Sequence, residues 1–228
     1  MCFLDFEGTQ FSHEMIAYGA VLATLNKDLT IKKHKAPIKL YVKNKNKIGR
    51  FVEDLTGITQ HDIDKMGVPF SSAMQQLKKY CGLHFKKCTF VTFGNHDMRI
   101  LSQSVAYNLD APIEITKQIS KYYFDYQSFI SEFIKDPNNN SLSLEKYLAF
   151  FGIEFSGTAH NPKYDALNLM YLYDAFLKNK DKVIAEYMQT LAKDTRLPKH
   201  VRDTLQMLAS GLTVALEEYM KLVKEYFE

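Results

Sequence analysis

The sequence predicts an α/β domain followed by an all-helical extension. Runs rich in β-branched and aromatic residues alternate with amphipathic helical patterns up to about residue 178, and this alternation is typical of α/β folds. From residue 180 onward no strand pattern remains. We therefore expect one domain over residues 1–179 and a C-terminal helical extension over residues 180–228.

The composition is that of an ordinary globular protein. The 228 residues are 46% hydrophobic and 24% charged, which suits one sizeable domain with an appendage. No apolar run reaches membrane-spanning length and the N-terminus lacks a signal-peptide pattern, so we expect neither a leader nor an anchor. The cysteines Cys2, Cys81 and Cys88 lack CxxC spacing, which argues against disulfides and structural zinc and favours the cytoplasm.

The first expected strand ends in Asp5-Phe6-Glu7, followed by Gly8. Successive side chains on a strand point to opposite faces, so Asp5 and Glu7 project together. Two adjacent carboxylates repel each other unless a cation lies between them, and their oxygens suit Mg²⁺ or Mn²⁺. The alternative is a solvated strand end, because Asp-x-Glu triplets are common.

A basic hairpin follows. Residues 15–25 predict a buried strand and residues 29–42 a more polar one, joined by a turn at Asn26-Lys27-Asp28. Residues 27–50 carry eight lysines and one arginine against one aspartate, a net charge of +8, whereas residues 180–228 are neutral. Since the whole chain carries +3, the remainder carries −5. This division suits a metal-dependent enzyme acting on a polyanion, and a solvated lysine-rich hairpin explains the patch equally well.

The central part of the chain continues the alternation. A β-rich run at residues 89–93 leads into Gly94-Asn95-His96-Asp97, where Asn95 is a plausible N-cap that places Asp97 in the first turn of a helix. A strand at residues 122–126 is followed by a helix, a loop at residues 136–140 and another helix that Gly152 ends. Helices are also expected at residues 48–55, 60–66 and 69–83.

The last part of the domain pairs a histidine with an acid. On one continuous helix His160 and Asp165 would lie about 140° apart. Asn161 as N-cap and Pro162 as the first helical residue place His160 in the preceding loop, and Asp165 near the helix N-terminus. His160 alone is more simply explained as a loop histidine, and Asp97 and Asp165 as first-turn acids that the helix dipole favours.

Together these residues form one constellation. Four acids and a histidine are expected at the ends of elements, and two metal ions about 3.5–4 Å apart need this many carboxylates. A histidine that titrates near neutral pH can accept the proton of the attacking water. The residues are Asp5, Glu7, Asp97, His160 and Asp165.

In this order the motifs resemble the DEDDh family of DnaQ-like 3′→5′ exonucleases, and most closely its Eri-like branch. The matching pieces are Asp5-Phe6-Glu7, Leu55-Thr56-Gly57-Ile58-Thr59, Asp97, and His160 five residues before Asp165, and the resemblance covers about residues 1–178. It implies a ribonuclease H-like fold with a five-stranded mixed sheet flanked by helices.

The resemblance also implies roles. Asp5 would bridge two Mg²⁺ or Mn²⁺ ions, Glu7 and Asp165 would hold one of them, and Asp97 the other. His160 would be the general base. Gly8 and Thr9 would bind the terminal nucleotide of a single-stranded substrate, with RNA favoured slightly over DNA.

Two other functions stay open. The apolar stripes of the neutral extension favour packing on the domain, on a second copy or on a protein partner, and no membrane role is expected. The chain would then be a regulatory binding protein, or a proofreading subunit of a polymerase. A zinc-protease reading of His13-Glu14 is excluded, because Ala17 stands where HExxH needs its second histidine.

Overall fold

The computed structural model describes residues 1–227 and divides into two compact units. The first comprises Met1–Gln127 and Leu144–Leu177, and the second comprises Ser128–Ser143 and Lys178–Glu228. The segment 128–143 thus groups with the C-terminal helices, while the predicted boundary after residue 179 stays a prediction. Within residues 1–227, no helix has both the length and the hydrophobicity that crossing a bilayer requires.

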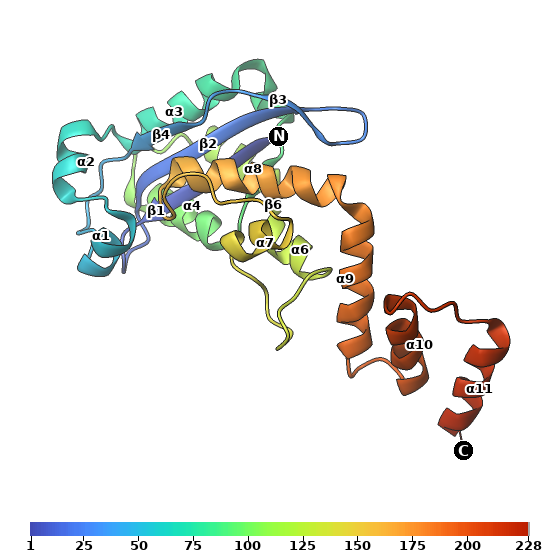
Figure 1. The fold of residues 1–228 in the computed structure, drawn as a ribbon. Coiled ribbons are helices and arrows are strands. Elements are labelled where there is room, and N and C mark those ends of the chain that lie inside the picture. Colours follow the sequence, from blue (N-terminus) through green and yellow to red (C-terminus); the bar gives the residue numbers. More distant parts are fainter. Residues whose placement is uncertain (228) are drawn as a thin grey trace. The chain divides into compact units, whose positions relative to one another are not determined.

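A mixed sheet lies at the centre of the first unit (Figure 1). Its strand order is β3-β2-β1-β5-β6, and β4 also pairs with β2. β1 is antiparallel to β2 and parallel to β5, which is in turn parallel to β6. The predicted α/β class and mixed sheet are confirmed. The central strands are β1 (Cys2–Gly8), β2 (Met15–Leu25), β5 (Phe90–Thr92) and β6 (Tyr123–Asp125).

The expected strand over residues 29–42 is interrupted, so the sheet has six strands rather than five. β3 (Ile31–His34) and β4 (Ile38–Tyr41) both pair antiparallel with β2, each along a different part of it. Pro37 lies in the gap between them, and proline has no N–H to donate to a strand ladder. One predicted edge strand therefore becomes two short ones.

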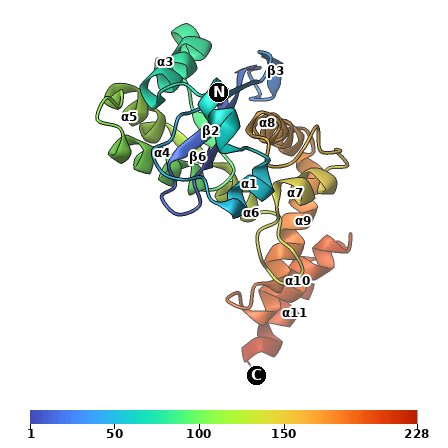
Figure 2. The same cartoon turned by 90° about the vertical axis from the view of Figure 1, so that its left-hand side faces the viewer.

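Helices cover both faces of the sheet (Figure 2). Leu4 and Phe6 pack on one face in a cluster that includes residues of α3, α4 and α5. Phe3 points to the other face, where its ring lies 5.5 Å from that of Tyr173 of α8. Alternation along β1 therefore directs Asp5 and Glu7 to the α8 side. The helices are α3 (Phe70–Cys81), α4 (His96–Tyr107), α5 (Ile113–Lys121) and α8 (Pro162–Lys178).

Shorter helices connect these elements. α1 ends at Gly57, which takes a left-handed conformation with φ of 67°, and a capping box between Thr59 and Asp62 begins α2. Both helices lie where the sequence predicts them, whereas α5 was not anticipated. The remaining short elements are α1 (Arg50–Thr56), α2 (Gln60–Met66), a 3₁₀ helix (Gly82–Lys87), α6 (Tyr126–Ser131) and α7 (Leu144–Phe150).

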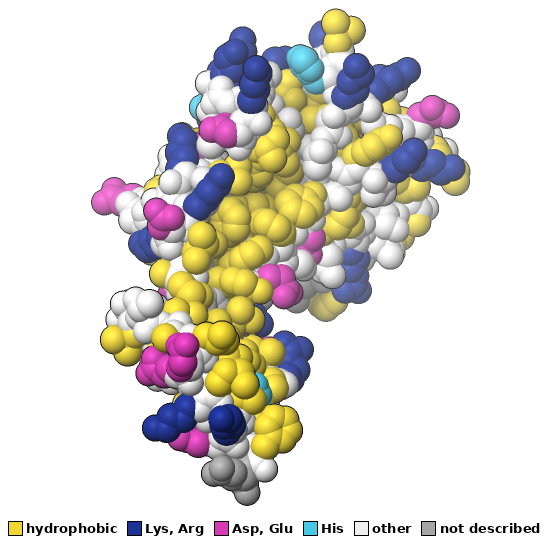
Figure 3. Space-filling view, turned by 90° about the vertical axis from the view of Figure 1, so that its right-hand side faces the viewer, with side chains coloured by type: hydrophobic (Ala, Val, Ile, Leu, Met, Phe, Trp, Pro, Cys, Tyr) yellow, Lys and Arg dark blue, Asp and Glu magenta, His cyan; other side chains and the backbone are white. Residues whose placement is uncertain are grey.

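The second unit is helical, as the sequence predicts. Its C-terminal part consists of α9 (Lys180–Lys193), α10 (Lys199–Ala209) and α11 (Leu216–Phe227). Gly211, which has φ of 81°, lies between α10 and α11. Hydrophobic side chains reach the surface of these helices (Figure 3), among them Leu216 and Phe227, the latter 80% exposed.

Candidate active site

The first two acids lie at the end of β1. Asp5 pairs with Gly19 of β2 and Glu7 pairs with Ala17, so both acids occupy the same face of the sheet. The Oδ2 atom of Asp5 is buried and accepts no hydrogen bond within residues 1–227. A buried carboxylate oxygen without a donor is costly, so this atom is a candidate metal ligand.

Asp97 lies in the first turn of α4 and is 5% exposed. Its Oδ1 accepts a 2.7 Å hydrogen bond from the backbone amide of Phe6, which ties α4 to β1 between the first two acids. Asp125, at the end of β6, accepts a 3.1 Å hydrogen bond from the amide of Gly94 and so supports the turn before Asp97. Asn95 occupies the N-cap position but makes no side-chain capping bond, contrary to expectation.

His160 and Asp165 lie at the start of α8, as the sequence predicts. The carbonyl of Asn161 accepts hydrogen bonds from the amides of Tyr164 and Asp165, at 2.8 and 3.0 Å, which leaves His160 in the loop before the helix. His160 is exposed and has a left-handed backbone with φ of 60°, which is uncommon outside glycine. Its backbone amide opposes the rise in the pKa of the Asp165 carboxyl group.

Gly19 lets this helix end approach the sheet. A Cβ atom on Gly19 would lie 1.8 Å from the carbonyl oxygen of Pro162 and 2.5 Å from the amide nitrogen of Lys163. Only glycine permits backbone contact this close. Because Gly19 is the partner of Asp5, the contact brings the start of α8 beside that acid.

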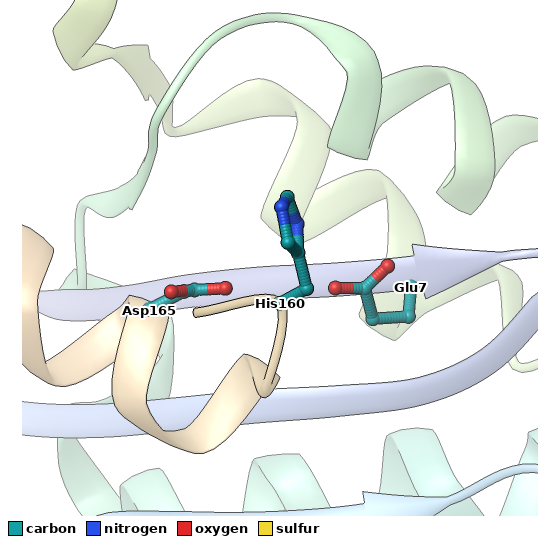
Figure 4. A group of neighbouring side chains, drawn as sticks. All are labelled: Glu7, His160 and Asp165. Atoms are coloured by element: carbon teal, nitrogen blue, oxygen red, sulfur yellow. The ribbon is translucent and has the colours of Figure 1, made fainter. Parts of the chain in front are cut away.

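These elements converge on one cleft of about 440 Å³. Ligand atoms of Glu7, His160 and Asp165 all lie within 4.8 Å of one another. Figure 4 shows the two carboxylates pointing toward each other, with the His160 imidazole standing between them. Asp5 and Asp97 line the same cleft. The structure therefore brings together all five residues that the sequence singled out.

Burial raises the pKa of every acid in the cleft, and repulsion from neighbouring acids adds to the rise for Asp5, Glu7 and Asp97. Burial raises the pKa of Glu7 to about 8, with Asp165 and Asp97 adding to the rise and Lys39 opposing it. Burial likewise raises the pKa of Asp97 and of Asp165 to about 7. Asp5 shows a pKa well above its usual range, first from burial and then from the three neighbouring acids. Four such carboxyl groups held together favour a bound cation.

The donor set fits divalent metal ions. Carboxylate oxygens are the ligands that Mg²⁺ and Mn²⁺ prefer, and an imidazole is also at hand. Asp97 keeps its Oδ2 after the bond to Phe6, and the Oδ2 of Asp5 has no donor in the described chain. These are the features of a candidate metal site.

Comparison with known proteins identifies the family. The family model RNase_T, described as an exonuclease, matches residues 2–173. The chain belongs to this exonuclease family. The predicted membership of the DEDDh exonucleases is thereby confirmed, and it supports a nuclease function. A comparison with curated protein sequences gave no match.

Solved structures of exonucleases share the fold. The nuclease domain of 3′hExo, a DEDDh family member bound to rAMP, is 23% identical with a TM-score of 0.59, over 78% of this chain and 91% of that one. Cell-death related nuclease 4 (CRN-4) is 21% identical with a TM-score of 0.60, over 78% and 63%. Exonuclease I of E. coli with a dA16 oligonucleotide is 15% identical with a TM-score of 0.60, over 84% and 43%. The chain thus spans less than two thirds of the last two.

Gly8 and Thr9, the expected nucleotide-binding residues of this exonuclease, line the cleft. The hydroxyl of Thr9 is already engaged, since it accepts a 2.9 Å hydrogen bond from the Glu14 amide and lies 2.6 Å from the Ser12 hydroxyl. Thr9 therefore shapes the turn between β1 and β2, and its contact with substrate stays a prediction.

The sequence pattern does not predict several of the residues that line the cleft. Phe51 and Val52 of α1 form part of the wall, together with Leu55 and Thr56 of the motif already noted. The rings of His13 and His96 meet edge to face, with centroids 5.2 Å apart, and both line the cleft. Nothing in the local pattern marks the two histidines as neighbours, because they lie on different elements.

Proposed function

We propose that this exonuclease is a metal-dependent 3′→5′ enzyme that releases nucleoside 5′-monophosphates from the 3′ end of single-stranded nucleic acid. The observation that carries the proposal is the approach of Glu7, His160 and Asp165 to within 4.8 Å in the acidic cleft. The shared fold with 3′-exonucleases supports the polarity.

In the proposed mechanism the four acids bind the metal ions and His160 accepts a proton. Asp5, Glu7, Asp97 and Asp165 would hold two divalent ions, Mg²⁺ or Mn²⁺, which supply activation of water and charge stabilisation at the phosphate. His160 accepts the proton from the water that attacks phosphorus, and the 3′ oxygen of the penultimate nucleotide leaves with the shortened strand. The exposed position of His160 in its loop gives the ring access to that water.

Oligonucleotides labelled at one end test polarity and chemistry together. With a 5′-labelled strand and Mg²⁺ or Mn²⁺, we expect a ladder that shortens one nucleotide at a time, and with a 3′-labelled strand immediate release of a labelled mononucleotide. Asp165→Asn should abolish both, and His160→Gln should slow both about 10²–10⁴-fold. Release of internal fragments, or full activity of Asp165→Asn, would refute the proposal.

The proposal also extends to the cellular compartment and to the kind of nucleic acid. We place the enzyme in the cytoplasm, with RNA slightly preferred over DNA, and matched ribo- and deoxyribo-oligomers digested side by side test that preference. The alternative is a binding role for the C-terminal helices toward a second copy or another protein, which the exposed Leu216, Met220 and Phe227 favour. Light scattering of the full chain and of a Met220→Lys variant distinguishes a dimer from a monomer.

A further inference from the structure

Glu14, the acid of the His13-Glu14 pair, is 1% exposed yet is not a cleft acid. Its carboxylate accepts hydrogen bonds from the backbone amide of Lys45, at 2.9 Å to each oxygen, and from the amide and the side chain of Asn46, both at 3.0 Å. Its own backbone is paired with Thr9. Through these hydrogen bonds Glu14 connects the loop between β4 and α1 (residues 42–49) to the turn between β1 and β2 (residues 9–14).

This loop lies beside the cleft, and we call it the rim of the cleft. The amide of Gln10, a cleft residue, donates a 2.8 Å hydrogen bond to the carbonyl of Ile48. Gly49, with φ of 93°, packs so closely on Gln10 that a Cβ would lie 2.5 Å from the side-chain oxygen. α1 begins at the next residue and supplies Phe51 and Val52 to the cleft wall.

The loop presents cations outward at every second residue. Lys43, Lys45 and Lys47 are exposed, whereas the intervening Asn44 and Asn46 are half-buried and hydrogen-bonded to Gln60 and Glu14 respectively. No acidic residue occurs from position 43 to position 50, where the exposed Arg50 begins α1. Within residues 1–227, neither Lys43 nor Lys47 forms an ion pair with a carboxylate.

The other half of the basic segment lies at the opposite end of the sheet. β3, which carries Lys32 and Lys33, pairs with Ala23–Leu25, at the end of β2 that lies away from α1 (Figure 1). The cleft includes Gly8, which pairs with Met15 at the start of β2. From Met15 to Thr24 an extended strand rises about 30 Å, at roughly 3.3 Å per residue. The charge of +8 in this segment is therefore divided between two distant places.

We propose that residues 43–50 bind the backbone phosphates of the nucleic acid strand on the 5′ side of the nucleotide held in the cleft, with Glu14 as the positioning residue for this surface. The inference rests on the proposed function. A 3′→5′ exonuclease holds the terminal nucleotide at its acids, so the strand that leaves the cleft must cross the rim. The Lys45 ammonium donates to the carbonyl of Tyr107, and Arg50 lies 3.8 Å from Asp54. The exposed ammonium groups of Lys43 and Lys47, which form no ion pair within residues 1–227, are therefore the groups best suited to bind the strand.

The test compares two double variants on two substrates. Lys43→Ala/Lys47→Ala removes the rim cations, and Lys32→Ala/Lys33→Ala removes two cations at the far end. The substrates are a 20-nucleotide single strand and the p-nitrophenyl ester of thymidine 5′-monophosphate, which has no upstream strand. For the rim variant we expect the KM for the oligomer to rise about tenfold. The slope of log(1/KM) against the logarithm of the salt concentration should become smaller by about 1.4, because each of the two lost phosphate contacts on a single strand contributes about 0.7.

The mononucleotide ester separates this inference from the proposed function. The rim variant should hydrolyse the ester at the wild-type rate, and the far-end variant should match the wild type on both substrates. Equal losses in the two double variants, or an unchanged KM in the rim variant, would overturn the inference alone. Wild-type protein that hydrolyses neither substrate would instead overturn the proposed function.

Glu14→Gln tests the positioning role. The carboxylate of Glu14 accepts hydrogen bonds from the backbone amides of Lys45 and Asn46. In Glu14→Gln the side-chain NH₂ group would face these N–H donors and cannot accept from them, so the loop should shift. We expect a raised KM for the oligomer with an unchanged kcat on the mononucleotide ester. A variant that loses both equally would show that Glu14 supports the whole fold and not this surface.

Discussion

The backbone amide of Phe6 donates a 2.7 Å hydrogen bond to Oδ1 of Asp97, across 91 positions of sequence. The bond fixes the start of α4 against the strand that presents Asp5 and Glu7. Because Asp97 also lines the cleft, one carboxylate combines this structural role with the proposed role of metal ligand. Two substitutions can separate these tasks.

Asp97→Asn should keep the fold and lose the activity. The asparagine oxygen can still accept the hydrogen bond from Phe6, but the charge that would hold a metal ion is gone, so we expect hydrolysis to fall at least about a hundredfold. Asp97→Ala should be equally inactive and also less stable by about 1–3 kcal/mol, because it leaves a buried N–H without an acceptor. Thermal unfolding of the two variants measures the difference. Equal melting temperatures would show that the bond to Phe6 contributes nothing to stability.

Without metal, the protein should become less stable as the pH rises. In the folded state the pKa of Glu7 is raised to about 8, and that of Asp97 and of Asp165 to about 7, against about 4 for unfolded acids. The folded state therefore binds more protons between about pH 4 and pH 8, and its stability falls across this window.

Melting temperatures in EDTA at pH 5.5 and pH 8.5 measure this dependence. We expect the lower value at pH 8.5, and we expect Mg²⁺ or Mn²⁺ to raise it more at pH 8.5 than at pH 5.5, since the ions bind the ionised acids. Asp165→Asn, which removes one of these acids, should show a weaker dependence on pH. A higher melting temperature at pH 8.5 in EDTA would contradict the raised pKa values.

The sequence could predict the acids because they depend on local patterns. Alternation along β1 places Asp5 and Glu7 on one face, and Asn161-Pro162 separates His160 from the helix that carries Asp165. These features follow from strand periodicity and helix capping, which short segments encode.

The contacts that hold the site together could not be predicted in this way. The hydrogen bond that the Lys45 amide donates to Glu14 spans 31 positions, and Gly19 contacts Pro162 from a distant part of the chain. Nothing local distinguishes Gly19 from any other glycine in a strand, and Glu14 was considered only for a zinc motif. Such pairs are set by the three-dimensional packing of elements that the sequence pattern describes one at a time.

Gly19→Ala should lower activity by moving the start of α8. The added Cβ would overlap the carbonyl of Pro162, so the helix end must retreat, and His160 and Asp165 with it. We expect kcat to fall at least tenfold, because a small misplacement of reacting groups has large effects on rate. Gly82→Ala is a matched control, with φ of 59° and no atom within 4 Å of the added Cβ. Similar loss of activity in the control would assign the effect to general destabilisation.

Asn168 should hold in place the loop that carries His160, through hydrogen bonds to the backbone of Ser156. Its side chain is fully buried, accepts a 2.9 Å hydrogen bond from the Ser156 amide, and donates to the carbonyls of Ser156 and Tyr164 at 2.9 and 2.8 Å. Asn168→Ala removes these three bonds and leaves the amide and carbonyl of Ser156 without this side-chain partner, which should destabilise the protein by about 1–3 kcal/mol per group that stays unsatisfied.

If Asn168 positions the loop, Asn168→Ala should also change kcat. We expect Asn168→Ala to lower kcat more than it changes KM, because the role proposed for His160 is to accept a proton from the attacking water, and other residues would bind the strand. Ser156→Ala is the control, since all three hydrogen bonds involve the backbone of Ser156 or Tyr164 and survive it. Initial rates on the mononucleotide ester, measured below the melting temperature of each variant, give kcat directly. If Asn168→Ala kept the wild-type kcat while melting several degrees lower, Asn168 would stabilise the loop without placing His160.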